Sequence, residues 1–203
     1  MTPVFDPQPI TLSAPHVRLE PLSLHHAKDL YEAGLDTDIW TYLPRAGFAS
    51  LEDTRGWITE VLADAKAGAI LPFAQVDPAT GRAFGSTRYL DIQRKNRGLE
   101  IGWTWIGQSH RRTPVNTEAK YLLLRHAFES LGAVRVQLKT DVRNVRSQNA
   151  ILRIGAQREG ILRHNMILPN GYIRDSVYFS VTNDEWPEVK RKLEAMMAPT
   201  ASR

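Results

Sequence analysis

The 203-residue sequence contains no cysteine. Disulfide bonds, thiolate metal sites and a cysteine nucleophile are therefore excluded, and a transferred group cannot be relayed through an enzyme thiol. The sequence also lacks any apolar run near the ~20 residues that a membrane span needs, and it begins without the basic start and apolar stretch of a secretory signal. We expect a cytoplasmic protein with no membrane partner.

The sequence also has little excess of charge of either sign. Lys and Arg number 26 against 22 Asp and Glu, which gives a formal net charge of +4. This mild excess suits an anionic ligand such as a nucleotide cofactor, although an ordinary basic surface explains it as well. Because no stripe of basic and aromatic residues is present, we expect no nucleic-acid partner.

The familiar catalytic and metal motifs are missing. No His, Asp and Glu cluster has the spacing of metal ligands, because the adjacent His25 and His26 are expected to diverge on a helix. No Gly-x-Ser-x-Gly elbow or Walker loop occurs either. We therefore expect no metal.

The chain is long enough for one α/β domain, and its first half predicts two helices and an antiparallel meander. Its 42% hydrophobic residues suffice for one core, expected at about residues 11–197 of a single domain 1–203, with the first ten and last six residues as frayed ends. Ser23 and Ser50 are the expected helix N-caps, with a short helical turn at 38–43 between the two helices. The predicted strands cover residues 16–22, 70–77, 84–92 and 99–106.

The second half predicts a crossover followed by a hairpin. Helices over 114–131 and 144–154 flank a strand at 134–139, so part of the sheet is expected to be parallel. The pair Asn170-Gly171 predicts a hairpin between 156–168 and 172–182, because both residues accept positive φ. With a terminal helix over 184–197, the pattern predicts a mixed sheet of about seven strands with helices on both faces.

One segment carries the signature of an anion site. Thr113 is a reasonable N-cap and Pro114 suits the first helical position, so the amides of Val115, Asn116 and Thr117 should point out of the helix start. These amides, the helix dipole, and Arg111 and Arg112 predict a site for a diphosphate. The simpler alternative is that the two arginines form a solvated basic loop.

At this segment the chain resembles the GNAT superfamily, whose loop Gln/Arg-x-x-Gly-x-Gly/Ala precedes a helix. The triplet Thr117-Glu118-Ala119 is similar to the RimJ/RimL-like branch, the ribosomal-protein N-terminal acetyltransferases, although Arg112 and Pro114 stand where the loop has glycines. The resemblance covers about residues 17–193 and includes Glu100-Ile-Gly102, Arg135-Val136, Asn144-x-x-Ser147, Gly155-Ala156, Glu159-Gly160 and Arg174-Asp175.

The resemblance implies a GNAT fold, a single mixed, mostly antiparallel seven-stranded sheet with a bulge and splay between the fourth and fifth strands. It also implies acetyl-CoA as the acyl donor, with no metal. The pantetheine arm would lie in the splay, with Asn144 opposite, although Asn144 has an alternative role as the N-cap of its own helix. The strand residues beside the arm would be Trp103, Thr104, Trp105 and Ile106.

The implied chemistry is direct attack of an amine on the thioester in a ternary complex. A backbone amide near Trp105 is expected to hold the oxyanion. Ser147 is the candidate proton donor to the thiolate, with Tyr178 as second choice or as a packed wall residue. Glu100 is the candidate base, unless it lies on a solvated strand face, with Glu159 in reserve.

A weak carboxylate base favours an N-terminal α-amine, which is roughly one-tenth neutral at pH 7, over lysine, which is neutral below about one part in a thousand. The acceptor wall is expected to include Trp40, Tyr42, His164, Arg174 and Asp175. The alternatives are a small-molecule amine N-acetyltransferase and a non-catalytic acyl-CoA sensor. The identity of the acceptor, the acyl chain length and the oligomeric state, a homodimer among the possibilities, stay open.

Overall fold

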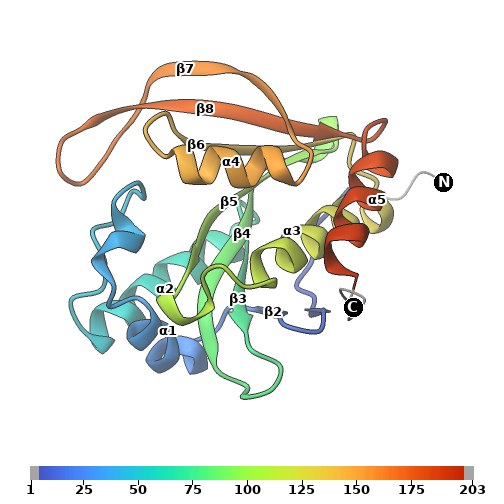
Figure 1. Ribbon diagram of the computed structural model, residues 1–203. Coiled ribbons are helices and arrows are strands. Elements are labelled where there is room, and N and C mark those ends of the chain that lie inside the picture. The colour runs from blue at the N-terminus through green and yellow to red at the C-terminus, as the bar shows by residue number, and fades with distance from the viewer. Residues whose placement is uncertain (1–4, 199–203) are drawn as a thin grey trace, which may run out of the picture.

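The computed structural model describes residues 5–198 and contains one sheet of eight strands with helices on both faces (Figure 1). The strand order is β1-β2-β3-β4-β5-β6-β8-β7, and every neighbouring pair is antiparallel except β5 and β6. The strand beyond the predicted seven is β1 (Leu12–Ser13), a two-residue strand that pairs with β2 (Arg18–Pro21). None of the helices in this part of the chain has the length and apolar content of a membrane span.

The N-terminal segment from Phe5 onward is packed against the sheet, whereas the sequence predicts that the first ten residues are frayed. Phe5 is buried and belongs to the same hydrophobic cluster as Leu12 and Val17. A large aromatic side chain gains about 1.5–3 kcal/mol from full burial, which is enough to hold this segment against the sheet. Residues 1–4 and 199–203 lie outside the described part.

One face of the sheet carries the first helices, η1 (Leu24–His26), α1 (Ala27–Ala33), η2 (Thr37–Trp40) and α2 (Leu51–Lys66). The predicted cap at Ser50 is confirmed, because its side chain accepts a hydrogen bond of 3.0 Å from the Asp53 amide. The hydrophobic cluster on this face includes Trp40, Phe48, Trp57 and Trp105. In Figure 1 these helices lie together beside the lower part of the sheet.

The prediction that His25 and His26 diverge is wrong. They lie in the tighter turn η1, and ligand-type atoms of Glu20, His25 and His26 all fall within 4.8 Å of one another. The Ser23 amide donates to His26 Nδ1 at 3.2 Å, so that nitrogen has no proton and Nε2 carries it toward Glu20. A metal on Nε2 would require the opposite tautomer, and the cluster is therefore a helix-capping arrangement.

The meander consists of β3 (Leu71–Val76), β4 (Ala83–Gln93) and β5 (Gly98–Ile106), with the turn η3 (Arg94–Asn96) before β5. Ser86 pairs with Trp105 and Arg88 pairs with Gly102, so Thr87 alone faces two residues of β5. The extra residue is Trp103, whose φ is +50°. This bulge reverses the alternation of side chains along β5.

The parallel pairing of β5 with β6 (Arg135–Asp141) is short. It joins Gly98, Leu99 and Glu100 to Arg135, Val136 and Gln137 and does not continue in the described chain. The backbone of β5 beyond Glu100 therefore has no strand partner on that side, and its polar groups are available to a ligand. The splay that the resemblance implied lies at this point.

The other face carries α3 (Val115–Arg125), the turn η5 (His126–Ser130) and α5 (Trp186–Met197), and α4 (Val145–Arg153) lies against β6. Tyr89 of β4 anchors α3, because its buried hydroxyl donates to the Leu123 carbonyl at 2.6 Å. Glu118 of the Thr-Glu-Ala triplet accepts the His16 amide at 2.8 Å and so ties the N-terminal segment to α3.

The hairpin of β7 (Gln157–Ile167) and β8 (Ile173–Thr182) is confirmed, but its turn differs from the prediction. Gly171 has φ of +81°, whereas Asn170 is not among the residues with positive φ. The Leu168 amide donates to the Tyr172 carbonyl at 2.9 Å, so three residues form the loop. A three-residue loop needs only one left-handed position, which the glycine takes.

Candidate active site

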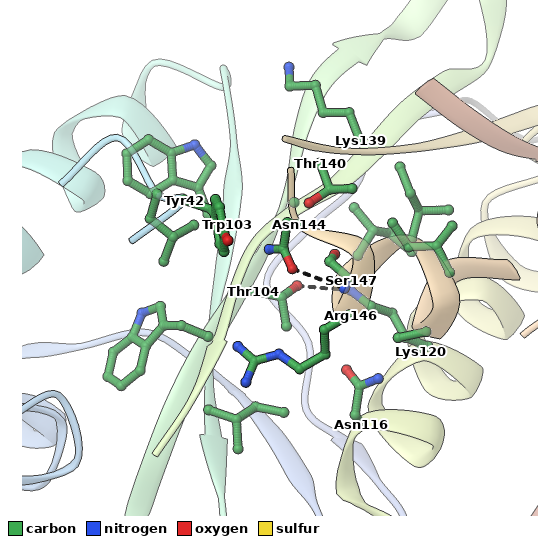
Figure 2. Close-up of a pocket in the computed structure, with 18 of the residues that line it drawn as sticks. Tyr42, Trp103, Thr104, Asn116, Lys120, Lys139, Thr140, Asn144, Arg146 and Ser147 are labelled. Carbon is green, nitrogen blue, oxygen red and sulfur yellow. Dashed lines mark hydrogen bonds between the residues drawn. The ribbon is translucent and has the colours of Figure 1, made fainter. Parts of the chain in front are cut away.

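A pocket of about 550 Å³ opens where β5 and β6 diverge (Figure 2). Its walls come from β5, the segment that leads into α3, β6 and α4. At one end it is closed by Ile39, Tyr42, Leu43 and Pro44 and by Met166 and Arg174 of the hairpin. In Figure 2, Tyr42 and Trp103 lie on one side of β5, and Lys120, Asn144 and Ser147 lie on the other.

Glu100 is the one Asp or Glu that lines the pocket within residues 5–198. It is 2% exposed, and its Oε2 accepts from Gln137 Nε2 at 2.8 Å and lies 3.1 Å from Lys139 Nζ. A Cβ at Gly102 would lie 2.8 Å from Oε1, so the glycine leaves room for the carboxylate. Oε2 is therefore fixed by β6, and Oε1 is the oxygen that an acceptor would meet.

The start of α3 has the exposed amides that the sequence predicts, but the cap is different. The cap position is Pro114, and the Thr113 hydroxyl donates to the His110 carbonyl at 2.7 Å, so the prediction that Thr113 caps the helix is wrong. The Glu118 amide makes the first bond of the helix, to Pro114 at 3.1 Å. The three preceding amides remain free for an anion.

The predicted residues at this helix start divide into two sets. Thr113 and Asn116 line the pocket, whereas the side chains of Val115 and Thr117 are buried outside it. The Thr117 hydroxyl accepts from Arg153 Nη2 at 2.9 Å. Only the backbone amides of Val115 and Thr117 are therefore available to the anion site.

Arg111 and Arg112 have different environments. Arg111 Nη1 lies 3.0 Å from Asp36 Oδ2, so much of its charge is already neutralised. Arg112 is exposed at the pocket rim with φ of +62°, a conformation that costs a non-glycine residue roughly 1–2 kcal/mol. Arg112 thus keeps the backbone shape of the glycine that it replaces and adds a guanidinium.

Two arginines of α4 were not predicted. Arg146 and Arg153 line the pocket, and within residues 5–198 neither forms an ion pair with a carboxylate. They are seven residues apart and so share a face of the helix. That spacing was present in the sequence, but nothing in the sequence showed which face of α4 meets the α3 start.

The tip of α4 confirms the cap predicted for Asn144. Its Oδ1 accepts the Ser147 amide at 3.0 Å, and both side chains line the pocket (Figure 2). The Asn144 side-chain amide and the Ser147 hydroxyl stay available to a ligand. The cap therefore fixes both groups at the edge of the gap.

Lys120 is a further pocket residue that the sequence analysis did not predict. It is 7% exposed, and its Nζ donates to Thr104 Oγ1 at 2.8 Å, which in turn contacts Thr87 Oγ1 at 2.8 Å. Burial lowers the pKa of Lys120 to about 7, although the charge of Glu100 opposes the change. The signal was a lysine inside the otherwise apolar run that continues to Leu124.

On β5, Trp103, Thr104, Trp105 and Ile106 all line the pocket, as the resemblance implied. Trp103 lies over the guanidinium of Arg88, whose carbon is 4.6 Å from the ring centroid. Burial lowers the pKa of Arg88 to about 10, because the charged form loses hydration there. The Trp103 ring is therefore held by a buried cation behind it.

Tyr42 and Arg174 lie together at one end of the pocket. Arg174 Nη1 donates to the Tyr42 carbonyl at 3.1 Å and so links the hairpin to the segment before α2. Burial lowers the pKa of Arg174, and its Nε has no hydrogen-bond partner in the described chain. An acceptor that offers an oxygen to this nitrogen would satisfy it.

Other predicted residues lie outside the pocket. Trp40 is a core residue whose Nε1 donates to the Gly34 carbonyl at 2.9 Å. His164 and Asp175 contact each other within the hairpin, where the His164 amide donates to Asp175 Oδ1 at 2.8 Å. Tyr178 lies over Lys139 on the sheet, and Glu159 forms an ion pair with Arg135.

Comparison with known proteins agrees with this geometry. A family model described as an acetyltransferase (GNAT) domain matches residues 16–157. The Bacillus subtilis (strain 168) protein provisionally named ribosomal N-acetyltransferase YdaF is 33% identical over 106 residues, which cover 52% of this chain and 57% of that protein. The chain therefore matches little more than half the length of that curated relative.

Two solved structures extend the likeness to almost the whole chain. A GCN5-related N-acetyltransferase from Brucella melitensis is 31% identical, with a TM-score of 0.91 over 98% of this chain and 90% of that one. Mycobacterium smegmatis RimJ in complex with CoA-disulfide is 21% identical, with a TM-score of 0.80 over 97% of each chain, which is a likeness of fold.

The chain belongs to the GNAT acetyltransferase family, because the family model covers well over half of it. The eight-stranded mixed sheet has the GNAT class of fold, with one strand more than the sequence predicted. The provisional name of the Bacillus subtilis relative, a ribosomal N-acetyltransferase, agrees with the RimJ/RimL-like branch that the sequence resembles.

Replacing Arg112 by glycine should separate stability from cofactor binding. We expect Arg112→Gly to lose one charged contact of ~1.5–3 kcal/mol, and so to weaken acetyl-CoA binding about 10-fold or more. Glycine removes the strain of a left-handed backbone at this position, but it also gives the unfolded chain more conformational entropy. The net effect should raise the free energy of unfolding by about 0.5–1 kcal/mol. Calorimetry and urea denaturation measure the two effects.

Arg112→Ala is the matched control. It removes the same guanidinium but keeps a Cβ at a φ of +62°, so it should lose the same affinity without gaining stability. Unchanged acetyl-CoA affinity in both variants would show that Arg112 does not contact the diphosphate.

Proposed function

We propose that this protein transfers an acetyl group from acetyl-CoA to a primary amine, namely the N-terminal α-amine of a protein or peptide, by direct attack in a ternary complex. The observation that carries the proposal is one continuous pocket that runs from the free amides of α3 to the buried carboxylate of Glu100. A nucleotide thioester and an amine would enter from opposite ends.

The donor end fits a diphosphate. Arg112, Arg146 and Arg153 surround the start of α3, and within residues 5–198 none of the three has a carboxylate partner at ion-pair distance. Charge-assisted bonds to phosphate are about twice as strong as neutral ones. The unpaired edge of β5 beyond Glu100 offers amides and carbonyls to the amide groups of a pantetheine arm.

The acceptor end fits an amine. Glu100 Oε1 would accept the proton that the amine loses as it attacks, directly or through a water. A β5 amide near Trp105 would stabilise the oxyanion, because the splay leaves that edge unpaired. The Ser147 hydroxyl lies on the α4 side of the gap, where the thiolate leaves.

The preference for an α-amine follows from its protonation. An α-amino group with a pKa near ~8 offers roughly one-tenth of its molecules as neutral amine at pH 7, and a lysine side chain near ~10.4 offers fewer than about one in a thousand. A carboxylate removes protons less readily than a histidine would, so the more acidic ammonium is the better acceptor. The relative named as a ribosomal N-acetyltransferase supports the same choice.

An acceptor screen tests this proposal. Short peptides with free N-termini, the same peptides blocked at the N-terminus but containing lysine, and free amino acids or polyamines would be compared by release of CoA thiol. We expect kcat/KM for free N-termini to exceed that for blocked lysine peptides by about 10-fold or more, given the protonation difference. Turnover of small amines alone would contradict the peptide acceptor.

Glu100→Gln should lower kcat by about 10²-fold while acetyl-CoA affinity stays unchanged, because general base catalysis is typically worth 10²–10⁴-fold. The matched control is Glu159→Gln, the same chemical change in a residue that pairs with Arg135 outside the pocket. Steady-state kinetics and calorimetry measure the two quantities. Equal losses in both variants would refute the assignment of Glu100 as base.

Arg174→Ala should raise the KM for the acceptor several-fold and leave acetyl-CoA affinity intact. The substitution removes the hydrogen bond to the Tyr42 carbonyl, so the hairpin and the segment before α2 are no longer fixed together at the acceptor end. Kinetics with the best peptide of the screen would measure the change. Acceptor kinetics identical to wild type would rule out this role.

A further inference from the structure

The pocket contains an amine of its own, Lys120 on the second turn of α3. Its side chain is buried, and within the described residues it forms no ion pair. Among residues 5–198 its one side-chain hydrogen bond is the 2.8 Å contact to Thr104 Oγ1 (Figure 2). A buried lysine without an acid is costly, so folding alone does not account for it.

The β5 bulge brings Thr104 to this lysine. Ile101 packs in the cluster on the α3 side, and strict alternation would place Trp105 there and turn Thr104 to the side of Glu100. Trp105 instead packs in the cluster of α1 and α2, because the extra residue Trp103 shifts the pattern by one. Thr104 therefore faces α3, while Glu100 faces the acceptor.

The groups around Lys120 come from four other elements and its own helix. β5 supplies the negative charge of Glu100, and β6 supplies Lys139, which already pairs with that carboxylate. The α4 helix supplies Ser147 and the positive charge of Arg146, and the polar residues Thr87 of β4 and Asn116 of α3 complete the set. Burial disfavours the ammonium and lowers the pKa of Lys120, whereas the charge of Glu100 favours the ammonium.

We propose that Lys120 donates the proton that the coenzyme A thiolate takes up as the thioester is cleaved. The acceptor nitrogen forms a bond to the acyl carbon, the carbon–sulfur bond breaks, and its electron pair goes to sulfur. The sulfur then receives a proton from the Lys120 ammonium, which becomes a neutral amine. The product nitrogen releases one proton to Glu100 or to water, and Lys120 regains one from solvent.

Ser147 alone is poorly suited to donate a proton to the thiolate. A thiol has a reference pKa near ~8.5, and a serine hydroxyl is a far weaker acid than that. A lysine that titrates at about 7 is matched both to the thiolate and to neutral pH. Ser147, fixed by the Asn144 cap, then orients the sulfur by a hydrogen bond.

The inference rests on the acyl transfer proposed above but not on the identity of the acceptor. Hydroxylamine, a small nucleophilic amine that is uncharged near neutral pH, can therefore replace the acceptor in the test. Release of CoA thiol would be followed from pH 5.5 to 9.5 for wild type, Lys120→Met, Lys120→Arg and Ser147→Ala. The exposed Lys192 supplies a matched control, Lys192→Met.

We expect wild-type kcat to fall as the pH rises through about 7, because the ammonium is the working form. In Lys120→Met, kcat at pH 6.5 should be about 10²-fold lower than in wild type, and it should no longer fall as the pH rises through this range. Lys120→Arg should be equally slow, because it keeps the charge but cannot release a proton. Ser147→Ala should be slower yet keep the decline, and Lys192→Met should match wild type.

The ¹³Cε chemical shift of Lys120, assigned by its loss in Lys120→Met, should titrate near pH 7 in the acetyl-CoA complex. Three results would each overturn the role of Lys120 while leaving the proposed acyl transfer intact. They are titration above pH 9, a Lys120→Arg enzyme as active as wild type, and a Lys120→Met enzyme within twofold of wild type. Wild-type protein that binds acetyl-CoA but releases no thiol would overturn the acyl transfer together with it.

Discussion

β5 and β6 run parallel and pair over only three residues of each strand, and the site depends on where this pairing ends. Up to Glu100 the two strands form one sheet, so the carboxylate is held by Gln137 and Lys139 of the neighbouring strand. Beyond Glu100 the same backbone stays paired with β4 but has no strand partner on the β6 side. One ladder therefore holds a rigid carboxylate, the proposed base, on one side of its last pair and leaves an unpaired strand edge on the other.

The end of the ladder also decides where charge gathers. Unpaired backbone attracts a polar ligand, and the α3 start and the α4 arginines face the same gap. Arg112, Arg146 and Arg153 at the donor end have no carboxylate partner among the described residues, whereas Lys139 is balanced by Glu100. An anionic donor and an amine acceptor are thereby directed to opposite ends, as electrostatic complementarity requires.

The sequence predicted the elements well where the signal is local. Caps such as Ser50 and alternating strands such as 134–139 depend on neighbours in the chain, and the structure agrees with them. Predictions failed where local rules left a choice open: His25 and His26 lie in a tighter turn than an α-helix, and Thr113 bonds backward instead of capping. Pocket residues such as Arg146 and Lys120 depend on contacts between distant segments, which no local pattern encodes.

A single extra residue in β5 determines which side of the strand carries Glu100, the proposed base, and which side faces Lys120, the proposed proton donor. Because Trp103 reverses the alternation, Glu100 meets the acceptor side and Thr104 meets α3, although both belong to one strand. Placed on opposite faces of one strand, a carboxylate and a lysine can each exchange a proton with a different atom of the same reaction. The bulge is thus as much a part of the site as the side chains that it separates.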